Sequence, residues 1–486
     1  MKAVLNQRRA GVLLHITSLP SRDLGRDAYY FVDFLQSIGA TVWQVLPLGI
    51  THEDGSPYQS LSAHAGNPAL ICFQSLVEKG WLSEKELCEI CGHSSFHRGC
   101  LLNKVFTGFQ AQATATEKED FEEFCKANDY WLDDFALFMV LRQKFNQESW
   151  NTWADEYKNR HIEAINDVRF FMKASVKIVK FEQYIFFKQW SALKTYANER
   201  GILMFGDIPI FVSYDSADVW ANRDVFKLSD AGDMSVVAGV PPDYFSETGQ
   251  RWGNPHYDWS YLHANGFDWW LERMKTQATL FDIVRIDHFR GLESAWEIPA
   301  TEPTAINGEW VLAEGEGLLS AITAQFSDVS LVAEDLGIIT PEVDTLRSKF
   351  NLPGMKIMQF AFSGEADNPY LPENHEENSV VYTGTHDNDT TIGWEKSLNE
   401  TQLAFVRKTL AIDENANIAE AMMRCALDSV ANLAILPMQD ILELDGSNRM
   451  NTPGTTFGNW QWHFHWKQVS SELPTRLAKW IKDSNR

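Results

Sequence analysis

The chain has 486 residues, a formal net charge of −24, and 22% charged residues against 44% hydrophobic ones. Its length is more than a small binding module needs, and its hydrophobic content is that of an ordinary globular protein, so a small module and a globally disordered chain are both excluded. Aspartate and glutamate total 66 against 42 lysines and arginines. The average field therefore repels polyanions, which predicts that nucleic acid and anionic membranes are not partners.

The sequence predicts neither a membrane-spanning segment nor a disulfide framework. Every apolar run is shorter than the roughly 18 residues that cross a bilayer. The short apolar run at 11–16 is predicted to be a first strand and not a leader peptide. Six cysteines in 486 residues are too few for a disulfide scaffold and fit a reducing compartment, so we expect a cytoplasmic protein.

Short aliphatic runs that end in polar residues alternate with helix-like segments along the chain. Eight such runs are predicted to be parallel strands, at residues 11–17, 41–48, 202–207, 281–287, 330–334, 355–360, 379–385 and 432–437. Helical patterns between them predict helices at 29–38, 269–279, 341–350 and 418–430. This alternation is typical of βα units around a parallel sheet, so the predicted fold is an α/β protein, a (β/α)8 TIM barrel.

Two stretches interrupt the alternation. Residues 73–197 are polar with a helical pattern and predict an inserted, mainly helical subdomain on the barrel rim. Residues 238–259 are crowded with glycine, proline and aromatic residues, and predict a long ordered active-site loop that is neither helix nor strand. The expected organisation is barrel strands one and two in 1–72, the helical subdomain in 73–197, and the rest of the barrel in 198–486.

Four carboxylates stand where predicted strands end, which is where the active site of such a barrel lies. They are Asp207, Asp287, Glu334 and Asp387. Arg285 is two residues before Asp287, so both side chains point to one face of the strand, and the guanidinium is expected to lower the pKa of Asp287. An ionised carboxylate beside a protonated one is the arrangement that cleaves a glycosidic bond. Glu334 follows an apolar run and is the candidate for the protonated partner.

The same residue types leave two other classes of function open. Acids after successive strands also present ligands to magnesium in metal-dependent isomerases and lyases, and His386 beside Asp387 could bind a softer metal. Arg285 in the site counts against dense cation binding. A noncatalytic sugar-binding protein is the third class, although binding requires aromatic platforms and hydrogen-bonding groups more than four inward-facing acids.

A separate cluster has approximately the spacing of a zinc site. It comprises Cys88, Cys91, His93, His97 and Cys100. Ser83 and Glu86 have the spacing of a capping box, which predicts a short helix that contains both Cys88 and Cys91. Buried or unreactive thiols are therefore expected, and a zinc site is an alternative that the sequence leaves open.

Several long strings of the sequence resemble, in chain order, the 4-α-glucanotransferases, the family of amylomaltases and disproportionating enzymes. The matching strings are SPYQSLSAHAGNP (56–68), GDIPIFV (206–212), GVPPDYFSETGQRWGNPHYDW (239–259), RIDHFRG (285–291), AEDLG (333–337), GMKIMQFAF (354–362), THDNDT (385–390) and NTPGTTFGNWQW (451–462). They span nearly the whole chain. The resemblance implies a (β/α) barrel with inserted helical subdomains that transfers α-1,4-glucan segments between oligosaccharides.

The resemblance also implies roles for individual residues. Asp287 looks like the catalytic nucleophile, Glu334 like the general acid/base, and Asp387 like a third carboxylate that holds sugar hydroxyls. The implied substrate-binding residues are Tyr58, Asp207, Gln250, Trp252, Arg285, Phe360 and His386. The expected reaction is a double displacement with retention, which requires the two reacting carboxyl groups to lie about 5–5.5 Å apart. It needs no metal or other cofactor, and the expected partners are maltooligosaccharides and α-1,4-glucans.

The loop at 238–259 is expected to decide whether sugar or water intercepts the covalent intermediate. As a cover, it would exclude water while Tyr244, Phe245 and Trp252 offer faces on which sugar rings stack. An α-glucan hydrolase would use the same carboxylates and differ only here, so it stays an alternative. Some family members carry a tyrosine just before the Ser-Pro-Tyr motif that helps form a second glucan site. Residues 51–55 here contain none, so that site is not expected, and the sequence makes no prediction of oligomeric state.

Overall fold

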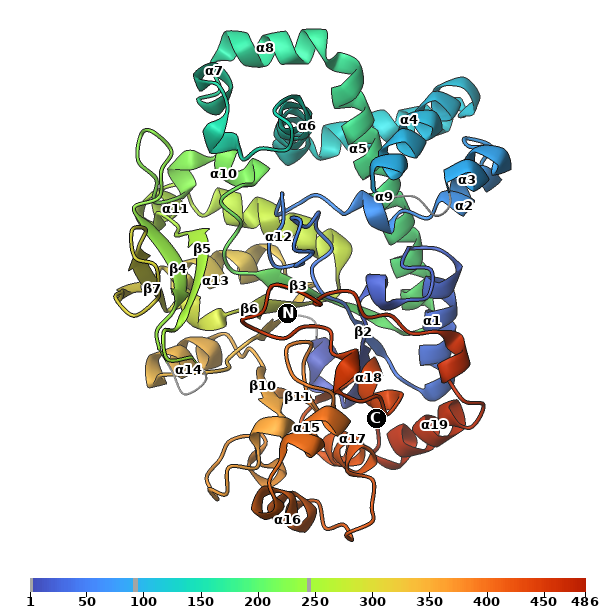
Figure 1. The fold of residues 1–486 in the computed structure, drawn as a ribbon, viewed down its shortest axis with the longest axis vertical. Helices are drawn as coiled ribbons and strands as arrows, with labels where there is room; N and C mark the ends of the chain where they lie inside the picture. Colours follow the sequence, from blue (N-terminus) through green and yellow to red (C-terminus); the bar gives the residue numbers. More distant parts are fainter. Residues whose placement is uncertain (1–2, 91–94, 243–245) are drawn as a thin grey trace.

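The computed structural model describes residues 3–90, 95–242 and 246–486 (Figure 1). Eight parallel strands form one sheet in the spatial order β10, β11, β12, β1, β2, β3, β6, β9. Their bounds are β1 Arg9–Leu13, β2 Val42–Gln44, β3 Leu203–Pro209, β6 Ile283–Asp287, β9 Ser330–Ala333, β10 Gly354–Ile357, β11 Ser379–Tyr382 and β12 Leu433–Pro437. Each of them overlaps one of the eight predicted strands.

The sheet closes into a barrel between its two outer strands. The backbone N–H of Ala333, which ends β9, donates to the carbonyl of Pro353, just before β10, at 2.9 Å. Every strand contributes to the cluster of apolar side chains inside the barrel, which includes Leu13, Val42, Phe205, Ile283, Val332, Met355, Ile357, Val380, Tyr382, Leu433 and Ile435. A packed interior of this kind is typical of a (β/α)8 barrel, and the predicted fold is confirmed.

The segments between the barrel strands, and the segment after the last one, form helices outside the sheet. Their bounds are α1 Arg26–Ile38, α10 Ala217–Ala221, α11 Trp259–Ala264, α12 Asp268–Leu280, α13 Gly315–Gln325, α14 Pro341–Lys349, α15 Thr391–Ser397, α16 Glu400–Thr409, α17 Ile418–Asp428, α18 Met438–Ile441 and α19 Leu473–Asp483. The first shows how they form: α1 buries Phe31, Val32 and Leu35 at helical spacing, and it ends at Gly39 in the left-handed conformation. The four helices predicted between strands match α1, α12, α14 and α17.

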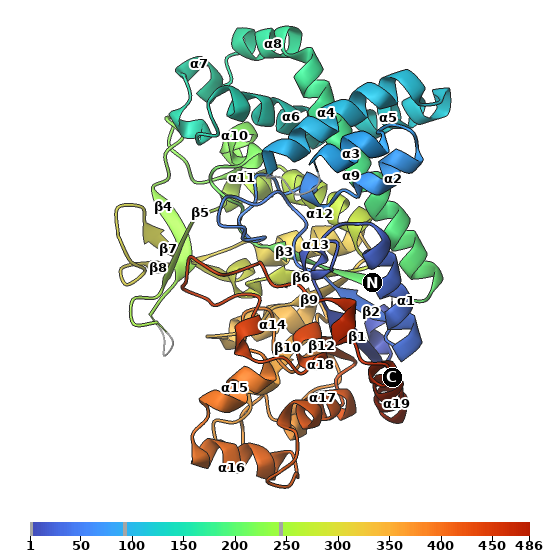
Figure 2. The same ribbon diagram turned by 45° about the vertical axis from the view of Figure 1, so that its right-hand side comes forward.

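Between β2 and β3 the chain leaves the barrel and forms a layer of helices along one side of the molecule (Figures 1 and 2). Their bounds are α2 Phe73–Glu78, α3 Glu84–Ile90, α4 Ser95–Gln112, α5 Ala115–Ala127, α6 Asp129–Lys144, α7 Asp155–Lys158, α8 Ile162–Phe171 and α9 Lys173–Glu199. The layer has an aromatic core, in which Phe181 lies 4.8 Å from Phe109 and 5.7 Å from Phe121 between ring centroids. Because α9 packs against both α6 and β3, it anchors this layer to the barrel.

The stretch at 238–259, predicted to be a loop, contains two strands of a second sheet. This sheet is antiparallel in the order β5, β4, β7, β8, with bounds β4 Val236–Val240, β5 Gln250–Pro255, β7 Ser294–Pro299 and β8 Glu309–Leu312. The prediction of neither helix nor strand is wrong here, because pairing with distant β7 outweighs the local turn-forming residues. A Cβ at Gly239 would lie 2.2 Å from the carbonyl oxygen of Gln250, so the glycine permits a close approach of the two strands.

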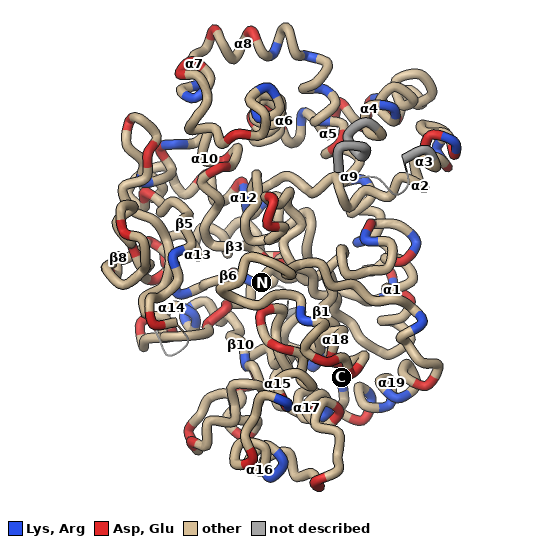
Figure 3. Tube along the Cα trace, in the orientation of Figure 1, with Lys and Arg blue, Asp and Glu red and all other residues tan. Residues whose placement is uncertain are grey.

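No helix in the described part of the chain is long and apolar enough to cross a membrane. Acidic side chains outnumber basic ones and are distributed over both the helical layer and the barrel (Figure 3). That this charge keeps nucleic acid away stays a prediction.

Candidate active site

Three of the four carboxylates predicted at strand ends come from neighbouring strands of the barrel. Asp207 lies near the end of β3, Asp287 ends β6, and Glu334 directly follows β9. The ladder between β3 and β6 pairs Asp207 with Arg285. Asp387 comes from the loop after β11. Parallel strands bring all four to the same end of the barrel.

Arg285 is the centre of a buried hydrogen-bond network. Its Nε donates to Asp207 Oδ2 at 2.9 Å, and its Nη2 donates to Asp287 Oδ1 at 2.8 Å. The same Nη2 lies 3.1 Å from the hydroxyl oxygen of Tyr58, which itself donates to Asp207 Oδ2 at 2.7 Å. The Arg285 side chain is 5% exposed and that of Asp207 is fully buried. The planar guanidinium therefore fixes two carboxylates in one geometry.

One acceptor in this network has no partner. Asp207 Oδ1 is buried and makes no hydrogen bond with the residues that the structure describes. A buried polar atom without a partner is costly, and the hydroxyl groups of a sugar are donors that could satisfy it. This makes Asp207 a candidate for contact with a bound sugar.

Burial and the one guanidinium set the charges in this network. Burial alone would lower the pKa of Arg285, but Asp207, Tyr58 and Asp287 raise it well above its ordinary value. Burial and the charge of Asp207 raise the pKa of Tyr58, so its hydroxyl remains a donor. Burial also raises the pKa of Asp287, which Arg285 opposes and the neighbouring carboxylates reinforce. The predicted contact is present and Arg285 lowers the pKa of Asp287 as expected, but burial has the larger effect, so the net direction is upward.

Glu334 is the second member of the central carboxylate pair. Its Oε2 accepts from the backbone N–H of His288 at 2.7 Å, and its Oε1 accepts from that of Leu336 at 3.0 Å. Burial raises the pKa of Glu334 to about 7, although Arg285 and these two N–H groups act in the opposite direction. Because Arg285 donates directly to Asp287, whereas Glu334 accepts from neutral N–H groups, the negative charge of the pair is favoured on Asp287.

Asp387 reaches the site from the loop after β11. Its side chain is 48% exposed, its Oδ1 accepts from Asn451 Nδ2 at 2.6 Å, and its Oδ2 lies 3.4 Å from His386 Nε2. The His386 ring stacks on Tyr58, with centroids 5.2 Å apart, which connects this loop to the network around Arg285. Burial lowers the pKa of His386, so its imidazole is neutral near pH 7.

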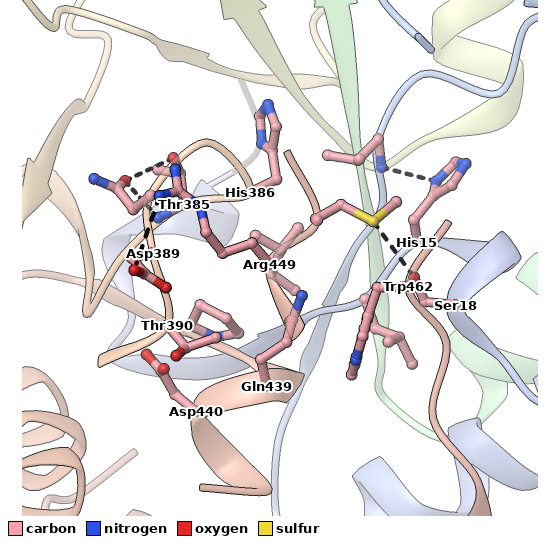
Figure 4. A pocket seen from close by; sticks show the side chains of 16 residues that line it. His15, Ser18, Thr385, His386, Asp389, Thr390, Gln439, Asp440, Arg449 and Trp462 are labelled. Carbon is pink, nitrogen blue, oxygen red and sulfur yellow. Dashed lines mark hydrogen bonds and ion pairs between the residues drawn. The ribbon is translucent and has the colours of Figure 1, made fainter. Parts of the chain in front are cut away.

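A small pocket of about 30 Å³ lies beside His386 at the ends of β1, β11 and β12 (Figure 4). Asp440, on its wall, accepts from the hydroxyl of Thr383 at 2.5 Å and from that of Thr391 at 2.8 Å. These two threonines flank the loop that carries His386 and Asp387. One buried carboxylate therefore holds both ends of that loop, and the pocket is part of the support of the site.

The second sheet brings Trp252 close to the carboxylate pair. The Trp252 ring lies edge to face with the ring of His288, with centroids 4.9 Å apart, and its Nε1 donates to Gln250 Oε1 at 3.1 Å. Trp252 is half-buried and Gln250 is exposed. Two of the residues predicted to cover the site therefore lie at its edge. Tyr244 and Phe245, predicted to cover it with them, lie outside the described residues.

Phe360 follows β10 in a short 3-10 turn, Met358–Phe360. Its side chain is 37% exposed and lies edge to face with Tyr370, with centroids 5.5 Å apart. Burial, together with the charges of Asp335 and Glu334, raises the pKa of Tyr370 to about 12. Because β10 lies beside β9, which Glu334 directly follows, Phe360 is an exposed ring on the Glu334 side of the site.

Three residues of the site are absent from the sequence-based prediction. Asn451 and His288 make the contacts described above, and the Trp460 ring lies 6.0 Å from Tyr58 and 5.9 Å from His386 between centroids. The backbones of His288 and Trp460 are left-handed, with φ of 52° and 63°. Such values are uncommon in large side chains and gather at functional sites. All three residues lie inside strings that carry the family resemblance, which is the signal that could have found them.

The possible zinc cluster is only partly described. Cys88 is an exposed free thiol in α3, and hydrogen bonds between Ser83 and Glu86 form the predicted capping box. Outside the described part of the structure lie Cys91, His93 and the side chains of His97 and Cys100. Within the described part, no group of three or more His, Cys, Asp or Glu side chains is placed to hold a metal ion.

Comparison with known proteins agrees with this geometry. The family model described as 4-alpha-glucanotransferase matches residues 14–469. A 4-alpha-glucanotransferase of Synechocystis sp. is 45% identical over 98% of this chain and 97% of its own length, and one of Thermus thermophilus is 45% identical over 99% of both. The structure of an amylomaltase from Streptococcus agalactiae in complex with acarbose, 36% identical, superimposes with a TM-score of 0.95 over 99% of this chain and 100% of that one. The chain belongs to the 4-alpha-glucanotransferase family.

Proposed function

We propose that this enzyme moves α-1,4-glucan segments between maltooligosaccharides by a double displacement with retention. The family gives the reaction class, and the similar amylomaltase structure contains acarbose, which supports an oligosaccharide as the substrate. The observation that carries the mechanism is the carboxylate pair. Asp287 is bound by Arg285, and Glu334 is bound by the backbone N–H of the residue after Asp287.

In the first step, an oxygen of Asp287 attacks the anomeric carbon of the donor, and the glycosidic bond to the leaving oxygen breaks. Glu334 gives its proton to that oxygen, which departs as the 4-hydroxyl of the shortened glucan. The transferred segment remains as a glycosyl ester on Asp287. Arg285, 2.8 Å from Asp287 Oδ1, favours the ionised carboxylate that this attack requires.

In the second step, Glu334 takes a proton from the 4-hydroxyl of the acceptor. The acceptor oxygen attacks the anomeric carbon, the ester bond breaks, and Asp287 leaves as a carboxylate. Glu334 must therefore be an acid in one step and a base in the other, which a pKa of about 7 allows near neutral pH.

The other predicted residues hold the sugar whose bond is exchanged. The unpartnered oxygen of Asp207 accepts from one sugar hydroxyl, and the half-exposed carboxylate of Asp387 accepts from others. Tyr58 and His386, whose rings stack on each other, form a neutral wall on the same side. Phe360 forms the aromatic wall on the acceptor side.

Trp252 and Gln250 cover the intermediate so that an acceptor sugar, and not water, reaches it. The contact between Trp252 and His288 supports this role, because His288 directly follows Asp287 in the chain. An α-glucan hydrolase on the same carboxylates is the nearest alternative. The metal-dependent alternative fits less well, because the guanidinium of Arg285 already neutralises Asp207 and Asp287 at the place where a cation would bind.

Maltotriose tests the proposed function. The pure enzyme should form longer oligomers and glucose while the total of reducing ends stays constant, and Asp287→Asn should form neither. Asp344→Asn, a change of an exposed aspartate on α14, is the matched control and should react like the original protein. Rising reducing ends without longer products would indicate a hydrolase. Equal rates with and without a chelator are expected, and a strict metal requirement would favour the metal-dependent alternative.

We further propose that the enzyme works in the cytoplasm on maltooligosaccharides and longer α-1,4-glucans. In the part of the chain that the structure describes, four cysteines are free thiols, one of them exposed, which is the state that a reducing compartment maintains. Fractionation of cells with an antibody against the protein would test this, and recovery outside the cytoplasm would contradict it.

A further inference from the structure

The segment that follows Glu334 has no regular secondary structure but holds one of the two donors to that carboxylate. The backbone N–H of Leu336 donates to Glu334 Oε1 at 3.0 Å, and Gly337, with φ of 84°, turns the chain directly afterwards. Irregular segments of this kind sample several positions unless contacts from elsewhere hold them. Arg290 provides such a contact, because its Nη1 donates to the carbonyl of Ile338 at 2.8 Å.

Arg290 is itself held by its surroundings. It is buried in the short 3-10 helix η6, Phe289–Leu292, three residues after the nucleophile Asp287. Its guanidinium carbon lies 3.8 Å from the ring centre of Trp310 on the edge strand β8. That ring is in edge-to-face contact with Trp296 on β7, with centroids 5.3 Å apart. Arg290 therefore joins three segments: the end of β6, the segment after β9, and the second sheet.

An arginine suits this position for a physical reason. A guanidinium is planar, so its face can stack on an indole ring while its edge donates to a carbonyl. A lysine carries the same charge on a compact ammonium group that cannot do both. The contact with Trp310 thus restricts Arg290 to orientations in which it can hold Ile338.

We propose that Arg290 is a positioning residue for the acid/base Glu334. By holding Ile338, it keeps the Leu336 N–H against Glu334 Oε1 and so fixes the direction in which that carboxyl faces the substrate. It also holds the segments after β6 and β9 together, and with them the spacing of the two carboxyl groups that a double displacement requires. The inference rests on the role proposed for Glu334. It adds a residue that does not itself touch the reacting atoms.

The test compares two donors that differ in their need for an acid. The leaving oxygen of maltotriose must be protonated, whereas α-maltotriosyl fluoride releases fluoride without a proton from the enzyme. We expect Arg290→Gln to slow formation of the glycosyl–enzyme from maltotriose by about 10-fold to 100-fold. The initial burst of fluoride from α-maltotriosyl fluoride should slow by less than about threefold, because attack by Asp287 does not depend on Glu334 as an acid.

A second readout is the pH profile of kcat/KM for maltotriose. The Leu336 N–H lowers the pKa of Glu334, so a weaker contact should raise it, and the alkaline limb of Arg290→Gln should move to higher pH. A residue that only stabilises the fold would leave that limb in place.

Three further variants calibrate the result. Glu334→Gln should show the same selective loss on maltotriose, in a stronger form. Arg407→Gln is the matched control, since Arg407 on the peripheral helix α16 (Figure 1) also donates to a backbone carbonyl, that of Asp413, at 2.7 Å. It should leave both rates unchanged. Arg290→Lys should restore little of the lost rate on maltotriose. An ammonium group cannot stack on the Trp310 ring and donate to the Ile338 carbonyl at the same time.

The two donors together distinguish a positioning role for Arg290 from a purely structural one. Equal losses on both donors in Arg290→Gln, or no loss on either, would overturn the proposal. If Arg290→Gln does not fold, Trp310→Leu removes the ring on which the guanidinium rests, and it should show the same selectivity more weakly. Equal losses on both donors in Glu334→Gln would instead refute the acid/base role of Glu334, and the positioning role with it.

Discussion

The barrel side and the sheet side of the site are built in different ways. On the barrel side, Arg285 and Asp207 are buried and Tyr58 is half-buried, and hydrogen bonds of 2.7 to 3.1 Å join the three side chains. On the sheet side, Trp252 is half-buried and Gln250 is exposed, and both belong to one strand of a small antiparallel sheet. The difference fits the proposed division of roles, in which preformed polar groups perform the chemistry and a more exposed strand controls what reaches the intermediate.

The largest effect should come from the barrel side, in Asp287→Asn. Without a carboxylate at this position no glycosyl ester forms, so transfer from maltotriose should fall by at least about 10⁴-fold. Initial rates measured by separation of products by chain length would show this. Asp387→Asn keeps the nucleophile and should lose less. If Asp287→Asn retained a tenth of the original rate, Asp287 would not be the nucleophile.

Arg285→Lys should have the next largest effect. A lysine keeps the positive charge but cannot donate along two fixed directions to Asp207 and Asp287, so kcat should fall roughly 10²-fold through loss of orientation. Steady-state rates with maltotriose, alongside thermal unfolding to establish that the variant folds, measure this. An unchanged kcat would mean that a positive charge at this position suffices for catalysis and that the two hydrogen bonds of the guanidinium are not needed.

The pH dependence should report Glu334. Its pKa is raised to about 7 by burial, and only the protonated form can act as the acid. The form is present below pH 7 and is lost as the pH rises through that value, so kcat/KM should fall about tenfold per unit above it. A profile of initial rates with maltotriose tests this. An alkaline limb two units lower would assign the acid to a carboxyl group with an ordinary pKa.

Trp252→Ala tests the role proposed for the sheet side, which is to keep water from the intermediate. Removing the ring opens the intermediate to water, so the ratio of hydrolysis to transfer should rise by several-fold, on the order of 1 kcal/mol, while attack by Asp287 changes less. Trp252→Phe keeps a ring near His288 and should lie between. Reducing ends and oligomer lengths measured in one reaction give the ratio. An unchanged ratio would remove the proposed role of the cover.

Phe360→Ala should have the smallest effect. The ring is exposed on the Glu334 side, so its loss should raise the KM for the acceptor by about threefold, through lost stacking of about 0.5–1 kcal/mol, and leave kcat nearly unchanged. Transfer to glucose at increasing concentration measures this KM. A fall in kcat with the same KM would move Phe360 from the acceptor wall to the support of the carboxylate pair.

The barrel side could be predicted from the sequence largely because its signals are local. Asp207 and Asp287 each stand at the end of an apolar run. Arg285 is two residues before Asp287 on a strand, so the alternation of side chains along the strand places these two on the same face. The net direction of the Asp287 pKa could not be predicted in this way. It depends on how deeply the whole fold buries the group, which no spacing in the chain reveals.

The sheet side was harder to predict for the opposite reason. The stretch 238–259, which contains most of β4 and all of β5, is rich in glycine and proline and is typical of a loop. Besides β5, the strand β4 pairs with β7, which begins only after the nucleophile. Asn451 reaches Asp387 from still farther along the chain. Contacts between distant segments leave no local pattern, so only the resemblance to a family placed Trp252 and Gln250 near the site.

Trapping the covalent intermediate tests the central claim most directly. Glu334→Gln should react with α-maltotriosyl fluoride, release about one equivalent of fluoride per enzyme in a burst, and then stall, because no base remains to activate an acceptor. Mass spectrometry of the digested protein should find the glycosyl group on the peptide that contains Asp287. A glycosyl group on Asp387 or Asp207, or release of fluoride without any labelled peptide, would contradict the double displacement through Asp287.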